Sequence, residues 1–244
     1  MSPTLAIMRR ELRSYFVTSL AWVFLVIFLV LAGLLTFYAG DFYERGLADL
    51  QPFFAVHPWL YLILVPAVSM RMWPEEARDG TQELLLTLPV TLRQAMLGKF
   101  LAAWLFLGLA LALTFPLWIT VNYLGSPDNG VILAGYLGSW LMAGAFAAIG
   151  ACLSTLTRSQ VVAFILTALV CVLLILAGQP QVLDFFQGTL PRRLVNGVAH
   201  LSMLRHFEAI SRGVLDLRDL IYFLLTILAW LAGGVLILEL KRTR

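Results

Sequence analysis

The side chains that could do chemistry are few, and the first to consider is the acidic pair Glu75 and Glu76 beside a long apolar window. Two carboxylates next to a membrane span could activate water, as in intramembrane proteases of the CAAX-processing type. Those enzymes also need an arginine five residues after the first glutamate and a histidine followed four residues later by asparagine. Residue 80 is Gly, and neither His200 nor His206 has an asparagine at that spacing. The pattern argues against an enzyme.

The sequence also lacks the residues that usually serve ion-driven transport, ATP binding and metal binding. Ion-driven transporters carry ionisable groups inside their spans, whereas the apolar windows here offer only His57, which we expect to make an interfacial hydrogen bond. Gly98-Lys99 lacks the upstream glycine and the following Ser or Thr of a phosphate loop. Cys152 and Cys171 are isolated in apolar windows. We therefore expect no cofactor in this chain, and any ATPase that supplies energy must be a separate subunit.

The segment between the second and third apolar windows, residues 71–99, is rich in charge and in residues that start or stop helices. Pro74 predicts the start of a short helix, because proline is favoured at the first helical position. Glu75 and Glu76 then fall in the first turn, where carboxylates interact well with the helix dipole. Gly80 can end this helix in a left-handed conformation.

A second turn and a third helix follow in the same segment. Thr81 predicts a cap with Glu83 near the start of the turn, and Pro89 ends it. Residues 91–94, Thr-Leu-Arg-Gln, form a capping box for a helix that runs through Lys99 into the next span. The segment is longer than antiparallel neighbours need. It therefore predicts an element that docks a cytoplasmic partner, with a solvated connector as the alternative.

Long apolar windows position these residues. The chain has 244 residues, of which 61% are hydrophobic and 13% charged, against about 25% charged in soluble proteins. Six windows without Asp, Glu, Lys or Arg are 19–29 residues long, and a spanning helix needs roughly 20. We predict an all-α integral membrane protein with a single transmembrane domain, residues 1–244. Its six transmembrane helices are placed near residues 17–39, 53–72, 99–123, 131–156, 160–182 and 219–239.

The positions of Lys and Arg predict the orientation of these spans. With the N-terminus inside, 11 of the 17 basic residues lie in cytoplasmic pieces, so the positive-inside rule places both termini in the cytoplasm. The outer stretch 184–218 is an exception, because it carries five arginines. Either the topology is wrong, or this stretch forms short external or re-entrant helices before the sixth span. Its many hydrophobic residues favour the second interpretation. The low net charge of +3 gives no basic stripe for nucleic acid.

Two further patterns concern helix faces. In the first 16 residues, a rotation of 100° per residue turns Arg9, Arg10, Glu11 and Arg13 toward headgroups and water. The apolar side chains that it groups on one arc are those of Leu5, Met8, Leu12, Tyr15 and Phe16. This predicts an interfacial helix in contact with membrane lipids, with a plain positive-inside anchor as the alternative. In the fourth span, small residues recur every four positions, which suits close helix packing within the chain or at a subunit interface. They are Ser139, Ala143, Ala147 and Ala151.

Taken together, the loop residues resemble the signature of ABC type-2 permeases, and most closely the branch of the gliding-motility permease GldF. The motif runs through residues 66–90 and continues at Gly98-Lys99. The resemblance resumes in residues 120–125, 160–164 and 206–219. The motif residues are Pro66, Ala67, Met70, Arg71, Glu75, Glu76, Gly80, Thr81, Glu83, Leu84, Leu85, Thr87, Pro89 and Val90.

The resemblance implies a six-span subunit of the bacterial inner membrane that pairs with a second copy or a paralogue and docks two ATP-binding subunits. The helix at 75–87 would be the coupling helix within a coupling loop, 73–90, and the stretch 184–218 would form external helices that close the outward path. Relatives act in export, and some work with an accessory membrane protein that has a large periplasmic domain. A non-transporting subunit that transmits motion to a periplasmic partner is the alternative.

The resemblance also implies roles for individual residues. Glu75, Glu76 and Arg78 would contact the ATP-binding subunit, while Gly80, Thr81 and Glu83 would hold the shape of the loop. Replacing Glu83 would then uncouple ATP turnover from transport without preventing membrane insertion. Arg9, Arg10 and Arg13 would mark an interfacial helix that moves with the loop. The external helices would carry His206, Glu208, Arg212 and Asp216.

Overall fold

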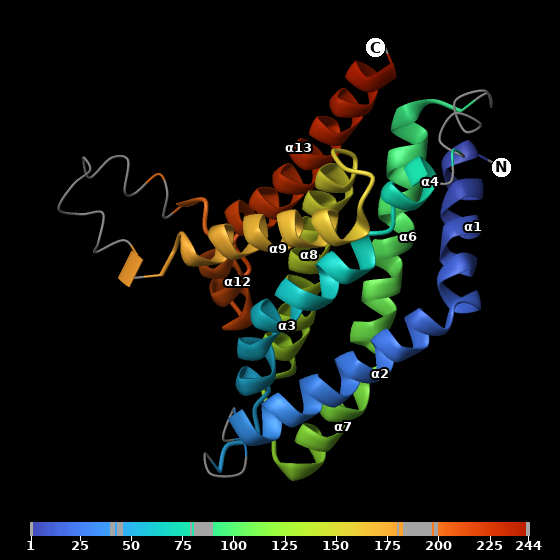
Figure 1. The fold of residues 1–244 in the computed structure, drawn as a ribbon. Coiled ribbons are helices and arrows are strands. Elements are labelled where there is room, and N and C mark those ends of the chain that lie inside the picture. Colours follow the sequence, from blue (N-terminus) through green and yellow to red (C-terminus); the bar gives the residue numbers. More distant parts are fainter. Residues whose placement is uncertain are drawn as a thin grey trace.

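The computed structural model of the chain describes residues 2–39, 42, 46–78, 80, 90–179, 181–182, 197 and 200–242, and every element in this part is helical (Figure 1). In chain order the elements are α1 (Pro3–Val17), α2 (Ser19–Leu34), the π-helix η1 (Leu35–Ala39), α3 (Gln51–Ser69), α4 (Pro74–Arg78), α6 (Leu92–Ala112), α7 (Phe115–Leu124), α8 (Asn129–Ser154), α9 (Gln160–Leu176), α12 (Met203–Ser211) and α13 (Leu217–Arg242).

Among the described residues, five helical stretches are long and apolar enough to cross a membrane, whereas the sequence predicts six spans. The predicted span at 160–182 contains α9, an apolar helix of 17 residues that is shorter than the others. At 1.5 Å per residue it extends roughly 26 Å, against about 30 Å for the hydrocarbon core. The five stretches are Ala21–Tyr38, Gln51–Arg78, Leu92–Leu124, Asn129–Ser154 and Leu217–Arg242.

Helix α8 is the centre of the bundle and packs against α3, α6, α9, α12 and α13. Its glycines allow these close approaches: a side chain at Gly150 would meet Ser69 of α3, and one at Gly144 would meet Trp104 of α6. The small residues Ser139, Ala143, Ala147 and Ala151 are all buried. Their predicted use in packing within the chain is therefore confirmed.

Helix α3 stays helical through Pro58 and Pro66, as expected for a span whose neighbours re-satisfy the backbone. The side chain of His57 is fully buried, so the hydrogen bond expected of it is made inside the bundle. Its Nδ1 lies 2.7 Å from the carbonyl oxygen of Phe53. Aromatic rings of α2 and α3 enclose the imidazole and keep it from the surface; they belong to Phe28, Phe53, Phe54 and Tyr61.

One end of the molecule, here called the terminal end, holds the start of α1, the short helix α4, the start of α6 and the end of α13 (Figure 1). Helix α7 lies at the opposite end. The chain reaches α7 through a break at Thr114, whose hydroxyl donates to the carbonyl of Leu111 at 2.6 Å just before Pro116. Helix α4, which opens the loop predicted to dock a partner, therefore lies at the same end of the molecule as the start of α1 and the end of α13 (Figure 1).

The predicted external stretch is described in part. Residues 183–196 and 198–199 lie outside the described residues, and α12 follows them. Helix α12 buries Met203, Phe207 and Ile210, and the last two lie against Gly138 of α8. A short amphipathic helix before α13 is thus present, as the hydrophobic residues of this stretch predict.

Candidate functional site at the terminal end

Four charged side chains meet where α1, α4 and α6 come together at the terminal end. They are Arg10 and Glu11 of α1, Glu76 of α4 and Lys99 of α6, here called the charge cluster. Two positive and two negative charges stand in it. The cluster joins three segments that are up to 88 residues apart in the chain.

Lys99 is the centre of the charge cluster. Only 3% of its side chain is exposed, and its Nζ lies 2.8 Å from Glu76 Oε1 and 3.2 Å from Glu11 Oε1. The same ammonium group lies 5.4 Å from the centre of the Trp73 ring, within range of a cation–π interaction. A buried ammonium needs such partners, because an unpaired charge in this position is costly. Lys99 therefore links α6 to both α1 and α4.

Arg10 closes the cluster from the water side. Its Nη2 lies 2.6 Å from Glu11 Oε1 and 3.4 Å from Glu76 Oε1, while its side chain stays 58% exposed. Burial alone would raise the pKa of the Glu11 carboxyl, but the positive charges of Lys99 and Arg10 outweigh it and lower that pKa. The hydrogen bond to Glu11 raises the pKa of the Arg10 guanidinium. The contacts within the cluster therefore favour the charged forms of Glu11 and Arg10.

The backbone beside Lys99 explains why α1 can reach it. A side chain on Gly98 would come within 2.8 Å of Ile7 Cγ2 and 3.0 Å of the Thr4 carbonyl oxygen. Glycine at this position lets α1 lie directly on the first turns of α6. Ile7 is the buried residue of α1. Further along, the Tyr15 ring stacks on Phe106 with 5.2 Å between the ring centres.

Local sequence signals position α4 and α6. Pro74 begins α4, and Glu75 and Glu76 fall in its first turn as predicted. Gly80 has φ of +71°, the predicted left-handed conformation. The Thr91 hydroxyl accepts from the Gln94 N–H, and the Gln94 side chain accepts from the Thr91 N–H, which confirms the predicted capping box.

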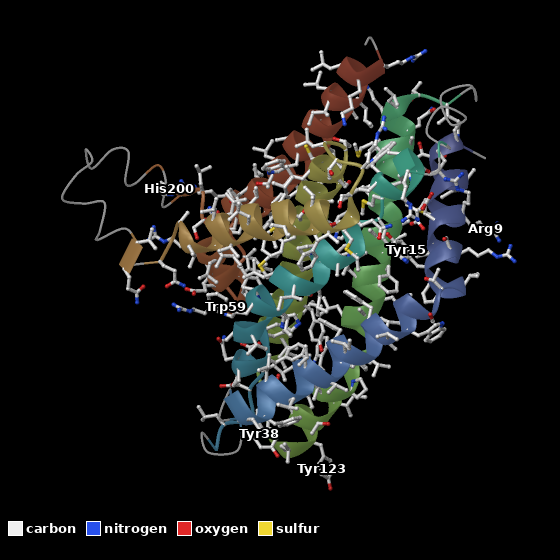
Figure 2. All side chains as sticks on the ribbon, viewed as in Figure 1. Arg9, Tyr15, Tyr38, Trp59, Tyr123 and His200 are labelled. Carbon is white, nitrogen blue, oxygen red and sulfur yellow. The ribbon has the colours of Figure 1, made fainter. Side chains whose placement is uncertain are left out.

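The predicted site residues divide between this cluster and its surroundings. Glu76 and Arg10 lie in the charge cluster, Glu75 is half-buried, and Arg78 is exposed. Arg9 and Arg13 are exposed, and Arg9 points away from the bundle (Figure 2). Thr81 and Glu83 lie outside the described residues.

The sequence pattern missed two members of the cluster. Glu11 was expected to face water, which is wrong, because Lys99 reaches it from α6. Lys99 was expected only as the edge of a span. One signal could have found the pair: a lysine at the start of a long apolar window, directly after a glycine, has to find a carboxylate on a closely packed neighbour.

A second polar group anchors α12 to α13. His206 Nδ1 lies 2.6 Å from Asp219 Oδ1, and its Nε2 lies 2.9 Å from the His200 carbonyl oxygen. The His206 ring stacks on Tyr222 at 4.0 Å between centres. Asp219 was not among the predicted site residues, although it stands in the first turn of α13.

The other predicted residues of this stretch have local roles. Glu208 and Arg212 form an exposed ion pair one helical turn apart, at 3.7 Å. The Asp216 carboxylate accepts from the Arg218 N–H and so stabilises the start of α13. The Gln51 amide donates to the Ser211 carbonyl oxygen at 3.0 Å, which joins α12 to the start of α3.

The charge cluster is built to join helices. Each of its carboxylates is paired with a cation of the same chain, and in the described part of the chain no group of three His, Cys, Asp or Glu side chains could hold a metal ion.

A comparison with curated proteins finds no match. The model of the family described as "ABC-2 family transporter protein" matches residues 5–238, nearly the whole chain. With its apolar spanning helices, this multi-pass membrane protein belongs to the ABC-2 family of transporter permeases.

Proposed function

We propose that this chain is the membrane-spanning subunit of an ATP-driven, exporter-like complex of the bacterial inner membrane. Two copies, or the chain and a paralogue, would pair and dock two ATP-binding subunits that hold ATP and Mg²⁺. The proposal includes six spans, with α9 as the fifth, and both termini in the cytoplasm. Membership of the ABC-2 family supports the permease role, and the loop motif at residues 66–90 favours the GldF-like branch.

The observation that carries the proposal is the position of Lys99 between Glu76 of α4 and Glu11 of α1. Helix α4 opens the loop that we expect to contact the ATP-binding subunit. A force applied to α4 would reach α6 directly and α1 through the same ammonium group. The charge cluster thus supports a coupling role in which three helices move together.

The residues of the loop then divide into two roles. Arg78 is exposed and Glu75 is half-buried, so they remain candidates for direct contact with the ATP-binding subunit, with Thr81 and Glu83 shaping the loop beyond Gly80. Glu76 has its carboxylate paired within the chain. We therefore assign Glu76 and Arg10 to transmission between helices rather than to the contact itself.

The contacts of α12 support the proposal that the stretch before α13 forms external helices. His206, Asp219 and Tyr222 fasten α12 to α13, and Gln51 fastens it to α3. A helix held in this way can close the outward path and move when α3 or α13 moves. An accessory protein with a periplasmic domain would meet this side of the complex.

The experiment that tests the proposal is purification of the tagged chain from its native membrane in mild detergent, followed by mass spectrometry and an ATPase assay. We expect a stoichiometric ATP-binding subunit. Arg78→Ala should weaken its retention at least several-fold, because an exposed cation at an interface contributes directly to binding. Arg218→Ala is the matched control, since Arg218 is an exposed arginine at the start of α13, the end away from α4.

Two outcomes would contradict the proposal. If no ATP-binding subunit is recovered under any mild condition, the loop does not serve as a docking element. If the subunit is recovered equally with Arg78→Ala, Glu83→Ala and the wild type, the contact lies elsewhere and the assignment of the coupling loop is wrong.

A further inference from the structure

Besides the charge cluster, the molecule has an apolar cavity of about 260 Å³ that is bounded by α1, α2, α3 and α6. Its wall is almost entirely hydrophobic, and Phe106 of α6, which also stacks on Tyr15, forms one side. Tyr15 lies on the face of α1 that is turned toward the bundle (Figure 2). The cavity is separate from the charge cluster, with which it shares no residue.

The cavity opens sideways, toward the surface of the bundle. Three of its rim residues are exposed: Val23 by 53%, Ile27 by 44% and Ile63 by 64%. In a multi-pass membrane protein, exposed aliphatic side chains on spanning helices face the hydrocarbon of the bilayer. The opening is therefore accessible to lipid chains.

One cation stands in this apolar wall. Arg71 lines the cavity just after the last turn of α3, and its side chain is half-buried. The Nε atom is fully enclosed and has no hydrogen-bond acceptor among the described residues. Within the described part of the chain, no carboxylate lies within ion-pair distance of the Arg71 guanidinium, although Glu75 follows one turn later. A half-buried guanidinium without an anionic partner is destabilising, so an anion bound beside it would be favourable.

We propose that this cavity binds an anionic phospholipid from the bilayer, with one acyl chain between α2, α3 and α6 and the headgroup phosphate at Arg71. The chemistry of the wall and the single cation match the two parts of such a molecule. The volume lies just below the usual range of about 300–1,000 Å³ for small-molecule sites, which suits one chain and leaves the second chain in the bilayer. Basic pockets between spanning helices near the cytoplasmic face are suited to anionic headgroups.

The position of Arg71 implies that a bound lipid would affect the connection between α3 and α4. Arg71 stands between the end of α3 and the start of α4, three residues before Pro74. A bound phosphate would fix this connection and so the direction in which α4 leaves α3. The site needs no ATP-binding subunit to be occupied, so its test is independent of the proposed coupling.

The test uses the full chain in nanodiscs that contain phosphatidylglycerol with a photoreactive diazirine in one acyl chain. After irradiation, mass spectrometry should find the label in the peptides that cover residues 21–27 and 63–67. Arg71→Gln should lower this labelling about five-fold, the factor expected for one cation near an anionic headgroup. Arg13→Gln is the matched control, because Arg13 is an exposed arginine on α1 outside the cavity, and it should label like the wild type.

A second pair of variants tests the acyl chain separately from the charge. Ala67→Phe fills the cavity while Arg71 remains, and it should abolish labelling of both peptides; Ala112→Phe, at an exposed position of α6, should not. Each variant must elute as the wild type does in gel filtration. Equal labelling by a phosphatidylcholine analogue, together with no effect of Arg71→Gln, would overturn the anionic site. Label spread evenly over all exposed helix faces would overturn the cavity as its location.

Discussion

The ammonium group of Lys99 lies 2.8 Å from the Glu76 carboxylate, although only 3% of the lysine side chain is exposed. Glu76 lies near the start of the loop 73–90 and Lys99 lies in the helix that follows this loop, so the contact fixes where the loop leaves and re-enters the bundle. A connector that only joined two spans would not need a buried ion pair at its base. The relationship makes the charge cluster testable without any knowledge of the cargo.

Removing the positive charge from the cluster should destabilise the protein. Lys99→Met leaves Glu11 and Glu76 without their shared cation. We expect a loss of about 2–3 kcal/mol in the free energy of unfolding, below the roughly 3–5 kcal/mol of a fully buried pair, because both carboxylates retain some solvent contact. Denaturation in mild detergent measures it.

Neutral partners should restore much of that loss. The triple variant Glu11→Gln, Glu76→Gln and Lys99→Met removes the unpaired carboxylates together, and such replacements of whole ion-pair groups are often close to neutral. Arg9→Met is the control, because Arg9 points away from the bundle (Figure 2). A triple variant less stable than Lys99→Met alone would mean that the cluster is not what holds these helices.

Acidification should weaken the same contact. The pKa of Glu11 is lowered in the folded protein, so its contribution is complete above the unfolded-state value of about 4.3 and is lost as the pH falls through the lower folded value. The unfolding temperature should therefore drop between about pH 5 and pH 3, and Glu11→Gln should flatten this drop. Glu208→Gln, at an exposed carboxylate of α12, should leave the profile unchanged.

The close approach of α1 to α6 gives a prediction on packing. Gly98→Ala puts a methyl group within 2.8 Å of Ile7 and 3.0 Å of the Thr4 backbone oxygen. Displacing α1 should cost about 1–3 kcal/mol and lower ATP turnover in the complex. Gly33→Ala in α2 is the control, since no atom of the described residues lies within 4 Å of the added methyl group. Alanine should favour the helix there by up to about 1 kcal/mol.

A second substitution separates crowding from other effects of Gly98→Ala. Adding Ile7→Ala removes the side-chain part of the clash and leaves only the contact with the Thr4 backbone. Stability should then recover in part. If Ile7→Ala adds its own loss in full to that of Gly98→Ala, the two positions are not in contact in the folded protein.

Local signals in the sequence predicted local structure well. The start of α4 at Pro74, the left-handed Gly80 and the capping box at Thr91 each depend on a few neighbouring residues, and all three are present. The resemblance to ABC type-2 permeases was carried chiefly by the same loop. Each of these features is determined by a side chain or a φ angle within one helical turn, so neighbouring residues suffice to predict it.

Contacts between distant segments could not be predicted in the same way. In a chain this apolar, a helix face that meets lipid and one that meets protein have the same composition. The apolar arc of α1 therefore identified Leu5, which is 44% exposed, and missed Ile7, which is buried against Gly98. Glu11 was misplaced for the same reason, because only the approach of α6 brings Lys99 to it. Composition also did not indicate that α9 ends at Leu176, because the window without charged residues continues beyond this point to residue 183.

Gly80 offers the most direct test of the loop itself. Its φ of +71° is unfavourable for any residue with a Cβ atom, and no atom of the described residues lies within 4 Å of an added Cβ. Gly80→Ala should therefore add strain of about 1–2 kcal/mol without a clash with them. If the residues after α4 dock an ATP-binding subunit, the altered exit from α4 should lower ATP turnover of the purified complex several-fold while membrane insertion is unchanged. Gly46→Ala is matched in every local respect, since Gly46 has φ of +59° and equally open surroundings but lies before α3. Equal ATP turnover in the two variants would show that the conformation at Gly80 does not matter for coupling, whereas a loss confined to Gly80→Ala would place the transmission of force in this turn.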